Sequence, residues 1–238
     1  MIDRSALRAR LADVRARIAR AAGRAGRDPA SIRLVAVSKT FPADYVRAAA
    51  DAGQIDFGEN KVQEALAKMD ETADLPLQWH LVGHLQSNKA RKAGARFDVV
   101  HSIDDAALIA RLDEAAAAAG RRVEVLVQVD LAGETTKYGA GQNELLSIFT
   151  AARTARAVQV SGLMLIPPAV EDPEQARPFF RRLRAVRDRL RDEGVEPAML
   201  NELSMGMTHD FEVAIEEGAT IVRIGTAIFG SRPVPNRV

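Results

Sequence analysis

The chain has 238 residues, 33 basic and 32 acidic side chains, and no cysteine, so disulfides, thiolate metal sites and cysteine nucleophiles are excluded. A net charge of +1 provides no overall field that would attract nucleic acid or an anionic membrane. No apolar run reaches the roughly 18 residues of a membrane span, and a single α/β barrel fills a chain of this length. We therefore expect one cytoplasmic domain that binds neither nucleic acid nor membrane.

The first segment predicts an amphipathic helix rather than a targeting signal. Asp3 and Asp13 interrupt its arginines, which argues against a transit peptide or a membrane-surface helix. We expect residues 1–30 to form a packed helix and a lead-in, residues 31–230 a barrel, and residues 231–238 a tail. The apolar residues of the helix are spaced four, three and four positions apart and so share one face: Leu7, Leu11, Val14 and Ile18.

Eight short apolar or β-branched runs follow, most of them separated by helical patterns. Alternating strands and helices predict a parallel sheet covered by helices. Eight such units in roughly 200 residues fit a closed (β/α)8 barrel better than an open sheet. The predicted fold class is therefore α/β, a single (β/α)8 barrel with an extra N-terminal helix. The candidate strands are residues 32–38, 55–57, 78–82, 99–103, 123–129, 158–166, 202–205 and 220–224.

The helix expected before Gly194 carries many arginines on the face opposite its apolar stripe. An arginine run could bind nucleic acid, but arginines mixed with carboxylates are more typical of a solvated helix face. The arginines are Arg181, Arg182, Arg184, Arg187, Arg189 and Arg191, and the carboxylates among them are Asp188, Asp192 and Glu193.

The histidines do not predict a metal site. His80 and His84 lie on or just beyond a strand, where four residues span about 13 Å, too far to chelate one ion. His101 and His209 have no partner that the sequence identifies. The chain also lacks the motifs GxxxxGK[ST], GxGxxG and GxSxG, so neither nucleotide-binding loops nor a nucleophile elbow are indicated.

Barrel enzymes carry their sites at the carboxyl ends of the strands, and the first predicted strand ends in Lys39. Strand alternation puts Lys39 on the same face as Val35 and Val37. Only six of the 33 basic residues are lysines, so a lysine is not expected by chance at this strand end. In a barrel mouth, desolvation would lower its pKa and leave free amine, the form that attacks a carbonyl. A lysine that simply ends a strand in solvent is the alternative.

The last predicted strand places Ile221, Arg223 and Gly225 on one face, so an inward face would bury a guanidinium that demands acceptors. Gly225 and Thr226 then open a short helix. The loops after strands seven and eight, with such a helix, form the usual phosphate site of a barrel. Thr208 is expected to cap the helix after strand seven. Together these features predict a phosphate site opposite the first strand.

A carbonyl-seeking lysine, a buried donor and a phosphate site are the parts that hold pyridoxal 5′-phosphate. The chain resembles the pyridoxal phosphate homeostasis protein family, whose fold is that of the N-terminal barrel of alanine racemase. The matching strings run through nearly the whole chain in order, and together they are very specific. They are AVSKT at 36–40, FGENKVQE at 57–64, WHLVGHLQSNK at 79–89, HSID at 101–104, GLMLIPP at 162–168, LSMGMTHDFEVAI at 203–215 and VRIGTAIFG at 222–230.

This resemblance implies that Lys39 carries pyridoxal phosphate as a Schiff base, that Asn60 lies beside its ring, and that Arg223 faces the pyridine nitrogen. It implies no catalytic residue and no metal ligand. Lys137 matches a further family lysine that could receive the cofactor transiently. The phosphate contacts fall on Gly225, Thr226 and either Ser204 or Thr208. The family commonly has serine where this chain has Thr208.

Three functions are compatible with these residues. The resemblance implies a carrier that supplies pyridoxal phosphate to apo-enzymes without turnover, and we expect a monomer rather than a dimer. A racemase or related enzyme is the alternative, but it needs a second acid or base and usually a second domain. The short sequence after Thr226 and the presence of only two tyrosines, Tyr45 and Tyr138, disfavour it. A Schiff-base aldolase that uses Lys39 without cofactor is least favoured, because the matching strings belong to the other family.

Overall fold

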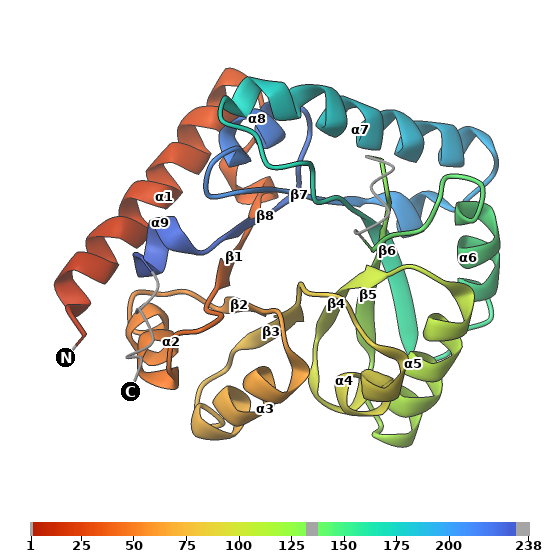
Figure 1. Cartoon of the computed structure of the whole chain (residues 1–238), viewed down its shortest axis with the longest axis horizontal. Helices are drawn as coiled ribbons and strands as arrows, with labels where there is room; N and C mark the ends of the chain where they lie inside the picture. Colours follow the sequence, from red (N-terminus) through yellow and green to blue (C-terminus); the bar gives the residue numbers. More distant parts are fainter. Residues whose placement is uncertain (1, 132–137, 232–238) are drawn as a thin grey trace.

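The computed structural model describes residues 2–131 and 138–231, and in these ranges eight parallel strands close into one barrel in chain order (Figure 1). Strands β1 and β8 complete the circle, with Val35 beside Arg223. The eight predicted strands and the (β/α)8 fold are confirmed. The strands are β1 (Arg33–Val37), β2 (Asp56–Glu59), β3 (Gln78–Leu81), β4 (Val99–Ile103), β5 (Val123–Gln128), β6 (Val158–Met164), β7 (Glu202–Met207) and β8 (Ile221–Ile224).

Helices surround the barrel and separate consecutive strands. Gly120 and Gly194 adopt positive φ angles of 65° and 88° just beyond α5 and α7, as expected of glycines that end helices. The helices are α1 (Arg4–Arg24), α2 (Ala43–Ala50), α3 (Val62–Glu71), α4 (Ala90–Arg96), α5 (Ala106–Ala118), α6 (Leu145–Ala152), α7 (Arg177–Asp192), α8 (Phe211–Glu216) and α9 (Thr226–Phe229). Short 3-10 turns are η1 (Pro29–Ser31), η2 (Ser87–Lys89), η3 (Pro173–Ala176) and η4 (Pro197–Leu200).

The apolar residues form two layers, as strand alternation requires. A large outer layer lies between the strands and the helices and includes Phe57 and Trp79. Gly58 belongs to the inner face, where an added Cβ would come within 2.9 Å of the Val35 side chain. The inner layer fills the barrel and consists of Val35, Val37, Val82, Val99, Leu126, Met164 and Ile221.

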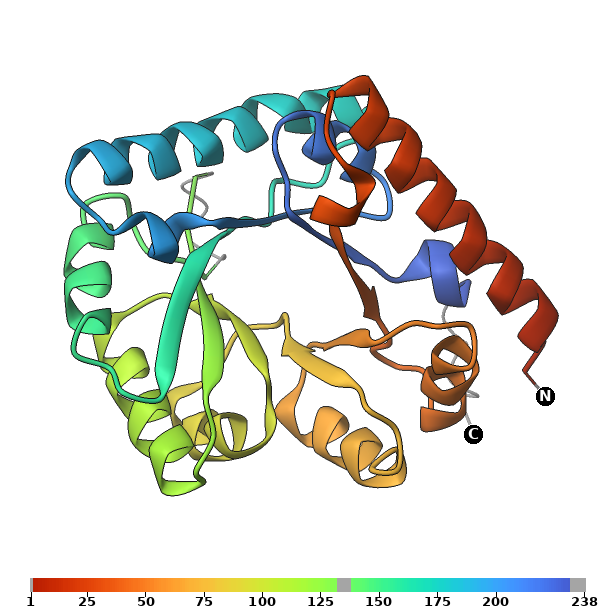
Figure 2. The same cartoon turned by 180° about the vertical axis from the view of Figure 1, so that it is seen from behind.

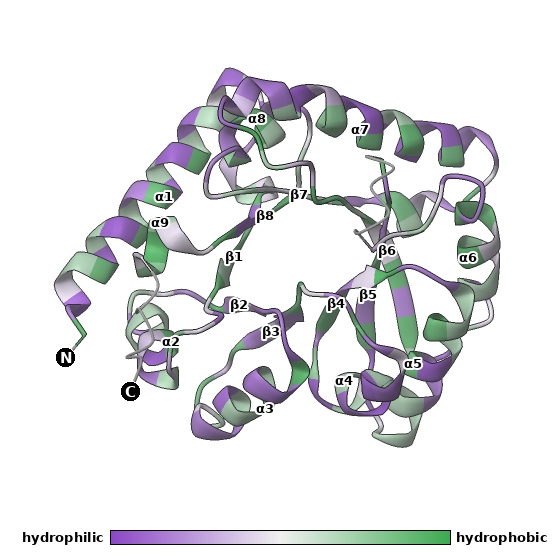
Figure 3. Cartoon of the chain, viewed as in Figure 1, coloured by the Kyte–Doolittle hydropathy of each residue, from purple (hydrophilic) through white to green (hydrophobic). Residues whose placement is uncertain are grey.

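Helix α1 flanks the barrel and packs against α2, α8 and α9 (Figure 2). Asp3 caps it by accepting a hydrogen bond from the Ala6 amide at 2.9 Å. Its buried face contains the predicted residues Leu7, Leu11, Val14 and Ile18. Hydrophilic and hydrophobic residues alternate along α1 and α7 (Figure 3). In the described ranges, no helix is long and apolar enough to cross a membrane.

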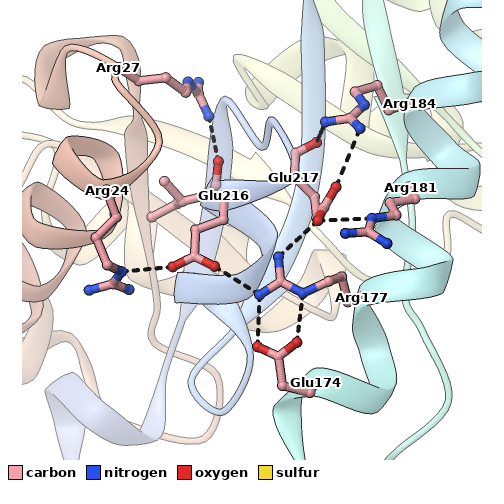
Figure 4. A network of polar contacts seen from close by, with 9 residues as sticks. Arg24, Arg27, Glu174, Arg177, Arg181, Arg184, Glu216 and Glu217 are labelled. Carbon is pink, nitrogen blue, oxygen red and sulfur yellow. Dashed lines mark hydrogen bonds and ion pairs between the residues drawn. The ribbon is translucent and has the colours of Figure 1, made fainter.

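The arginine-rich face of α7 is largely paired with carboxylates (Figure 4). Arg181 and Arg184 contact the Glu217 carboxylate at 3.1 and 3.4 Å. Arg177 donates to Glu217 and to Glu216, each at 2.8 Å. Further along the helix, arginines 187 and 189 pair with Asp188 and Glu193. The pairs to Glu216 and Glu217 join α7 to α8, and together with the pairs within α7 they neutralise much of the charge that the arginine run carries.

One local prediction is wrong. Thr208 does not cap α8, which begins at Phe211 with Asp210 at the cap position. The Asp210 carboxylate instead turns back and accepts a hydrogen bond from the Met207 amide at 2.7 Å. This contact tightens the turn after β7 and leaves the Thr208 hydroxyl directed elsewhere. Residues 232–238, most of the predicted tail, lie outside the described ranges.

Candidate functional site

The predicted site residues gather at the carboxyl ends of β1, β2, β7 and β8, which meet at one mouth of the barrel (Figure 1). Lys39 follows β1 and is half-buried, and Asn60 follows β2. Thr226 opens α9 directly after β8. A Cβ added to Gly225 would lie 3.1 Å from the Val37 carbonyl oxygen, so this turn packs against the strand that leads to Lys39.

A buried ionic cluster holds the backbone before Lys39. The Lys68 ammonium donates to the Ser38 carbonyl oxygen at 2.8 Å, to Glu59 at 2.6 Å and to Glu64 at 2.9 Å. The Ser38 hydroxyl donates to the same Glu59 oxygen at 2.7 Å. We call Ser38, Glu59, Glu64 and Lys68 the Lys68 cluster. Burial raises the pKa of Glu59, against the opposing effect of the ammonium.

The same cluster holds the backbone after Lys39. Thr40 has a φ angle of 70°, a left-handed conformation that is unusual for a β-branched residue. Its amide donates to the Glu64 carboxylate at 2.6 Å. Burial alone would raise the pKa of Glu64, but the hydrogen bonds from Lys68 and from Thr40 lower it overall. The Lys68 cluster therefore holds the backbone on both sides of Lys39. A left-handed backbone such as that of Thr40 is strained, and strained residues are common at functional sites.

Asn60 is positioned by a glycine that the sequence analysis did not single out. An added Cβ at Gly83 would lie only 2.3 Å from the Asn60 carbonyl oxygen. The loop after β3 therefore approaches the Asn60 backbone as closely as it does because position 83 has no side chain. The signal was present in the sequence as the glycine of the WHLVGH string.

Arg223 points into the barrel below the mouth and is almost fully buried, so the face that it shares with Ile221 is the inward one. Its guanidinium donates to the Ser204 hydroxyl at 2.6 Å and to the Leu165 carbonyl oxygen at 2.8 Å. These bonds use two of its five N–H groups. Burial lowers the pKa of Arg223 to about 10, so it remains a cation at neutral pH.

The structure separates the two candidate hydroxyls for a phosphate. Ser204 is fully buried inside the barrel, and its oxygen already accepts the bond from Arg223. Thr208 instead lies at the start of α9, where its hydroxyl oxygen is 3.5 Å from the Ala227 amide nitrogen. The residue at the cap position of α9 is Gly225, which has no side chain that could accept from the first amides of the helix. The geometry therefore brings Thr208, and not Ser204, to the loop of Gly225 and Thr226.

The opposite side of this mouth carries an aromatic pair. The Tyr138 ring stacks on His84 with ring centroids 3.5 Å apart and an angle of 8° between the planes. His84 also lies 3.5 Å from the Asp104 carboxylate. Within the described residues, His, Cys, Asp and Glu form no group of three or more that could hold a metal ion. Lys137 lies outside the described ranges.

Comparison with known proteins agrees with this fold. The family described as alanine racemase, N-terminal domain, matches this sequence over residues 2–233. A pyridoxal phosphate homeostasis protein of Aquifex aeolicus is 44% identical over 223 residues, which is 94% of this chain and 97% of that protein. Its counterpart in Pseudomonas aeruginosa is 46% identical over 222 residues, 93% of this chain and 94% of that protein.

Solved structures extend the comparison. PipY of Synechococcus elongatus, determined with pyridoxal phosphate bound, is 41% identical, has a TM-score of 0.83 and aligns with 94% of this chain and 100% of its own. An alanine racemase of Clostridium difficile has a TM-score of 0.70 at 13% identity. It aligns with 98% of this chain but only 58% of the racemase chain, and this likeness shows the fold alone.

The fold and the mouth thus define a barrel of the alanine racemase N-terminal-domain class. Within that class, the chain belongs to the pyridoxal phosphate homeostasis protein family.

Proposed function

We propose that this chain binds pyridoxal phosphate at the carboxyl-terminal mouth of its barrel and supplies it to apo-enzymes without catalytic turnover. One observation carries the proposal: a half-buried lysine, a buried guanidinium and a glycine-rich helix start with a nearby hydroxyl share one barrel mouth. The pyridoxal phosphate in the PipY structure supports the identity of the ligand.

The residues of the mouth fit the parts of this ligand. When bound, pyridoxal phosphate supplies an aldehyde that condenses with a primary amine, and we assign that amine to Lys39. The amides of Gly225 and Thr226 and the hydroxyl of Thr208 would hold the phosphate. Asn60 would lie beside the ring.

Arg223 argues for a carrier rather than an enzyme. A guanidinium donates hydrogen bonds and cannot accept one, so Arg223 would hold a pyridine nitrogen unprotonated. An unprotonated ring withdraws electrons weakly, which disfavours carbanion chemistry unless a well-placed second base compensates. Tyr45 packs against Phe41 in the outer layer, with ring centroids 4.9 Å apart, and is no candidate for that base. Tyr138 is the described tyrosine at the mouth, and it is the residue that would serve as the second base if the protein were a racemase.

Borohydride reduction tests the site. Reduction of the protein loaded with pyridoxal phosphate, followed by peptide mass mapping, should place the adduct on the peptide that contains Lys39. The variant Lys39→Ala should lose most of the absorbance of the bound cofactor while keeping its circular dichroism spectrum. Label found only at other lysines would contradict the assignment.

Two assays test the role. The loaded protein should restore activity to an apo-transaminase, and incubation with single-enantiomer amino acids should give no racemisation on chiral chromatography. Steady racemisation that disappears in both Lys39→Ala and Tyr138→Phe would favour the enzyme instead.

We also propose that the protein acts as a monomer in the cytoplasm, in the same compartment as the apo-enzymes that it would serve. Light scattering should give the mass of one chain, and cell fractionation should recover the protein with cytoplasmic markers.

A further inference from the structure

Polar side chains form a continuous line through the interior of the barrel. The Arg223 guanidinium donates to the Ser204 hydroxyl, whose oxygen lies 2.8 Å from Nδ1 of His101. Nε2 of His101 lies 2.9 Å from Nδ1 of His80. Nε2 of His80 lies 3.0 Å from a carboxylate oxygen of Asp56. We call these five residues the relay. It connects β8, β7, β4, β3 and β2.

The two ends of the relay point to one arrangement of its protons. Arg223 can only donate, and the Asp56 carboxylate can only accept. With one proton on each imidazole, His80 donates from Nε2 to Asp56 and accepts at Nδ1 from Nε2 of His101. Nδ1 of His101 then accepts from the Ser204 hydroxyl, whose oxygen accepts from Arg223. In this arrangement both histidines are Nε2–H tautomers, and all four hydrogen bonds run in the same direction.

Burial and charge agree with this arrangement. Ser204, His80 and His101 are fully buried. Burial lowers the pKa of His101 well below its usual value, and the positive charge of Arg223 lowers it further, so the ring is neutral. The Asp56 side chain keeps 25% of its surface exposed at the opposite end of the barrel from the mouth.

Arg223 has an unusual environment for a buried cation. In the part of the chain that the structure describes, its hydrogen-bond partners are neutral oxygens, one hydroxyl and one carbonyl. Buried charges are normally paired directly. The Asp210 carboxylate acts on the charge of Arg223 electrostatically and is not one of these hydrogen-bond partners. Along the hydrogen-bonded line, the first acidic side chain is Asp56, reached through Ser204 and the two histidines.

We propose that Asp56, His80, His101 and Ser204 are positioning residues for Arg223. They hold the guanidinium in one orientation through a hydroxyl instead of a carboxylate, so in the described residues no acidic side chain is hydrogen-bonded to its remaining N–H groups. Those groups stay available to a ligand in the mouth. The last step rests on the proposed function, because it identifies the pyridine nitrogen as the acceptor.

Nuclear magnetic resonance of the cofactor-free protein tests the relay itself. Two-bond ¹H–¹⁵N spectra of protein labelled at histidine distinguish the two neutral tautomers from each other and from the doubly protonated ring. Both His80 and His101 should show the Nε2–H pattern at neutral pH. An Nδ1–H tautomer or a doubly protonated ring at either position would overturn the proposal, whether or not the protein binds pyridoxal phosphate.

Variants at the far end test the positioning role. Asp56→Leu should weaken pyridoxal phosphate binding about three- to tenfold and shift the absorbance of the bound cofactor, although residue 56 lies at the other end of the barrel. Asp56→Asn keeps an acceptor for His80 and should lose less. Ser161→Ala is the matched control, because it removes a part-buried hydrogen bond of 2.6 Å to Glu124 that lies outside the relay.

A second pair covers the case in which Asp56→Leu does not fold. Ser204→Ala should weaken binding to a similar extent, whereas Ser204→Thr keeps the hydroxyl and should retain the affinity and the spectrum. The positioning role is wrong if the wild-type protein binds cofactor but Asp56→Leu has the same affinity as the control Ser161→Ala. It is equally wrong if Ser204→Ala has the same affinity as Ser204→Thr. Failure of the wild-type protein to bind any pyridoxal phosphate would instead remove the proposed function and, with it, the ligand that Arg223 is said to meet.

Discussion

Two side chains of α3 hold the backbone on either side of Lys39. The Lys68 ammonium contacts the Ser38 carbonyl oxygen, and Glu64 contacts the Thr40 amide. A flexible four-carbon side chain is useful for carrying a ligand only if its backbone anchor is stationary, since any movement of the anchor is added to that of the side chain. The buried cluster supplies that anchor.

The variant Lys68→Met should therefore be strongly destabilised. It leaves the Glu59 carboxylate buried without its cation, and loss of one partner of a buried ion pair costs about 3–5 kcal/mol. Urea denaturation should show this decrease in the free energy of unfolding. Lys61→Met is the control, because Lys61 is exposed one position before α3 and should change stability by less than about 0.5 kcal/mol. Equal stabilities of the two variants would show that the cluster is unimportant.

Thr208 should contribute to binding only when the ligand carries a phosphate. Hydrogen bonds to charged groups contribute about 1.5–3 kcal/mol, so Thr208→Val should weaken pyridoxal phosphate binding about tenfold or more. Binding of pyridoxal, which lacks the phosphate, should not change. Fluorescence titration with both ligands measures the difference, and Thr208→Ser should behave as the wild type. A matching loss for both ligands would place the phosphate elsewhere.

At the scale of elements, one aspartate ties a helix to the following strand. Asp113 of α5 accepts hydrogen bonds from the amides of Arg156, Ala157 and Val158 at 2.9, 2.7 and 2.8 Å, at the start of β6. Burial alone would raise its pKa, but the three amides lower it overall from the usual value of 3.8. The ionised carboxylate is thus the form that stabilises this junction.

The sign of the pH dependence follows from that lowered pKa. A carboxylate with a lower pKa in the folded state stabilises the protein above the unfolded pKa, and this contribution is lost as the pH falls through the folded pKa. Asp113→Asn should cost about 1–2 kcal/mol at pH 7, and the difference from wild type should shrink below pH 3.8. Urea denaturation at both pH values measures it. Glu114→Gln, an exposed neighbour on α5, should show no comparable difference. A constant difference across this range would contradict the assigned role.

At the scale of the whole molecule, ligand binding should stabilise the closed barrel. The mouth joins residues from both ends of the chain, with β1 paired to β8, so a ligand there binds the folded state alone. At a concentration of about one hundred times Kd, pyridoxal phosphate should add about 2.7 kcal/mol, which raises Tm by roughly 5–10 °C in a chain of this size. Differential scanning calorimetry should detect this rise in the wild type and a much smaller one in Lys39→Ala. An equal rise in both would show that Lys39 is not the main contact.

The sequence by itself determined the features that depend on local pattern. Apolar runs and helical spacing predicted the eight strands and the buried face of α1, and strand alternation predicted that Val35 shares a face with Val37 and Arg223 with Ile221. The position of Lys39 at a strand end followed from the same pattern. These features are readable because burial repeats with the period of the backbone itself, so neighbouring residues carry the information.

Only the tertiary structure decided which polar groups meet. The prediction that Thr208 caps α8 was wrong, because Asp210, two residues later, occupies the cap position. In the sequence, a hydroxyl before a helix looks the same whether it caps that helix or contacts another one. The contact between His101 and Ser204 joins residues 103 positions apart. No periodicity encodes such a contact, because a polar side chain finds its partner only when closure of the barrel excludes water and leaves the strands to satisfy each other's donors and acceptors.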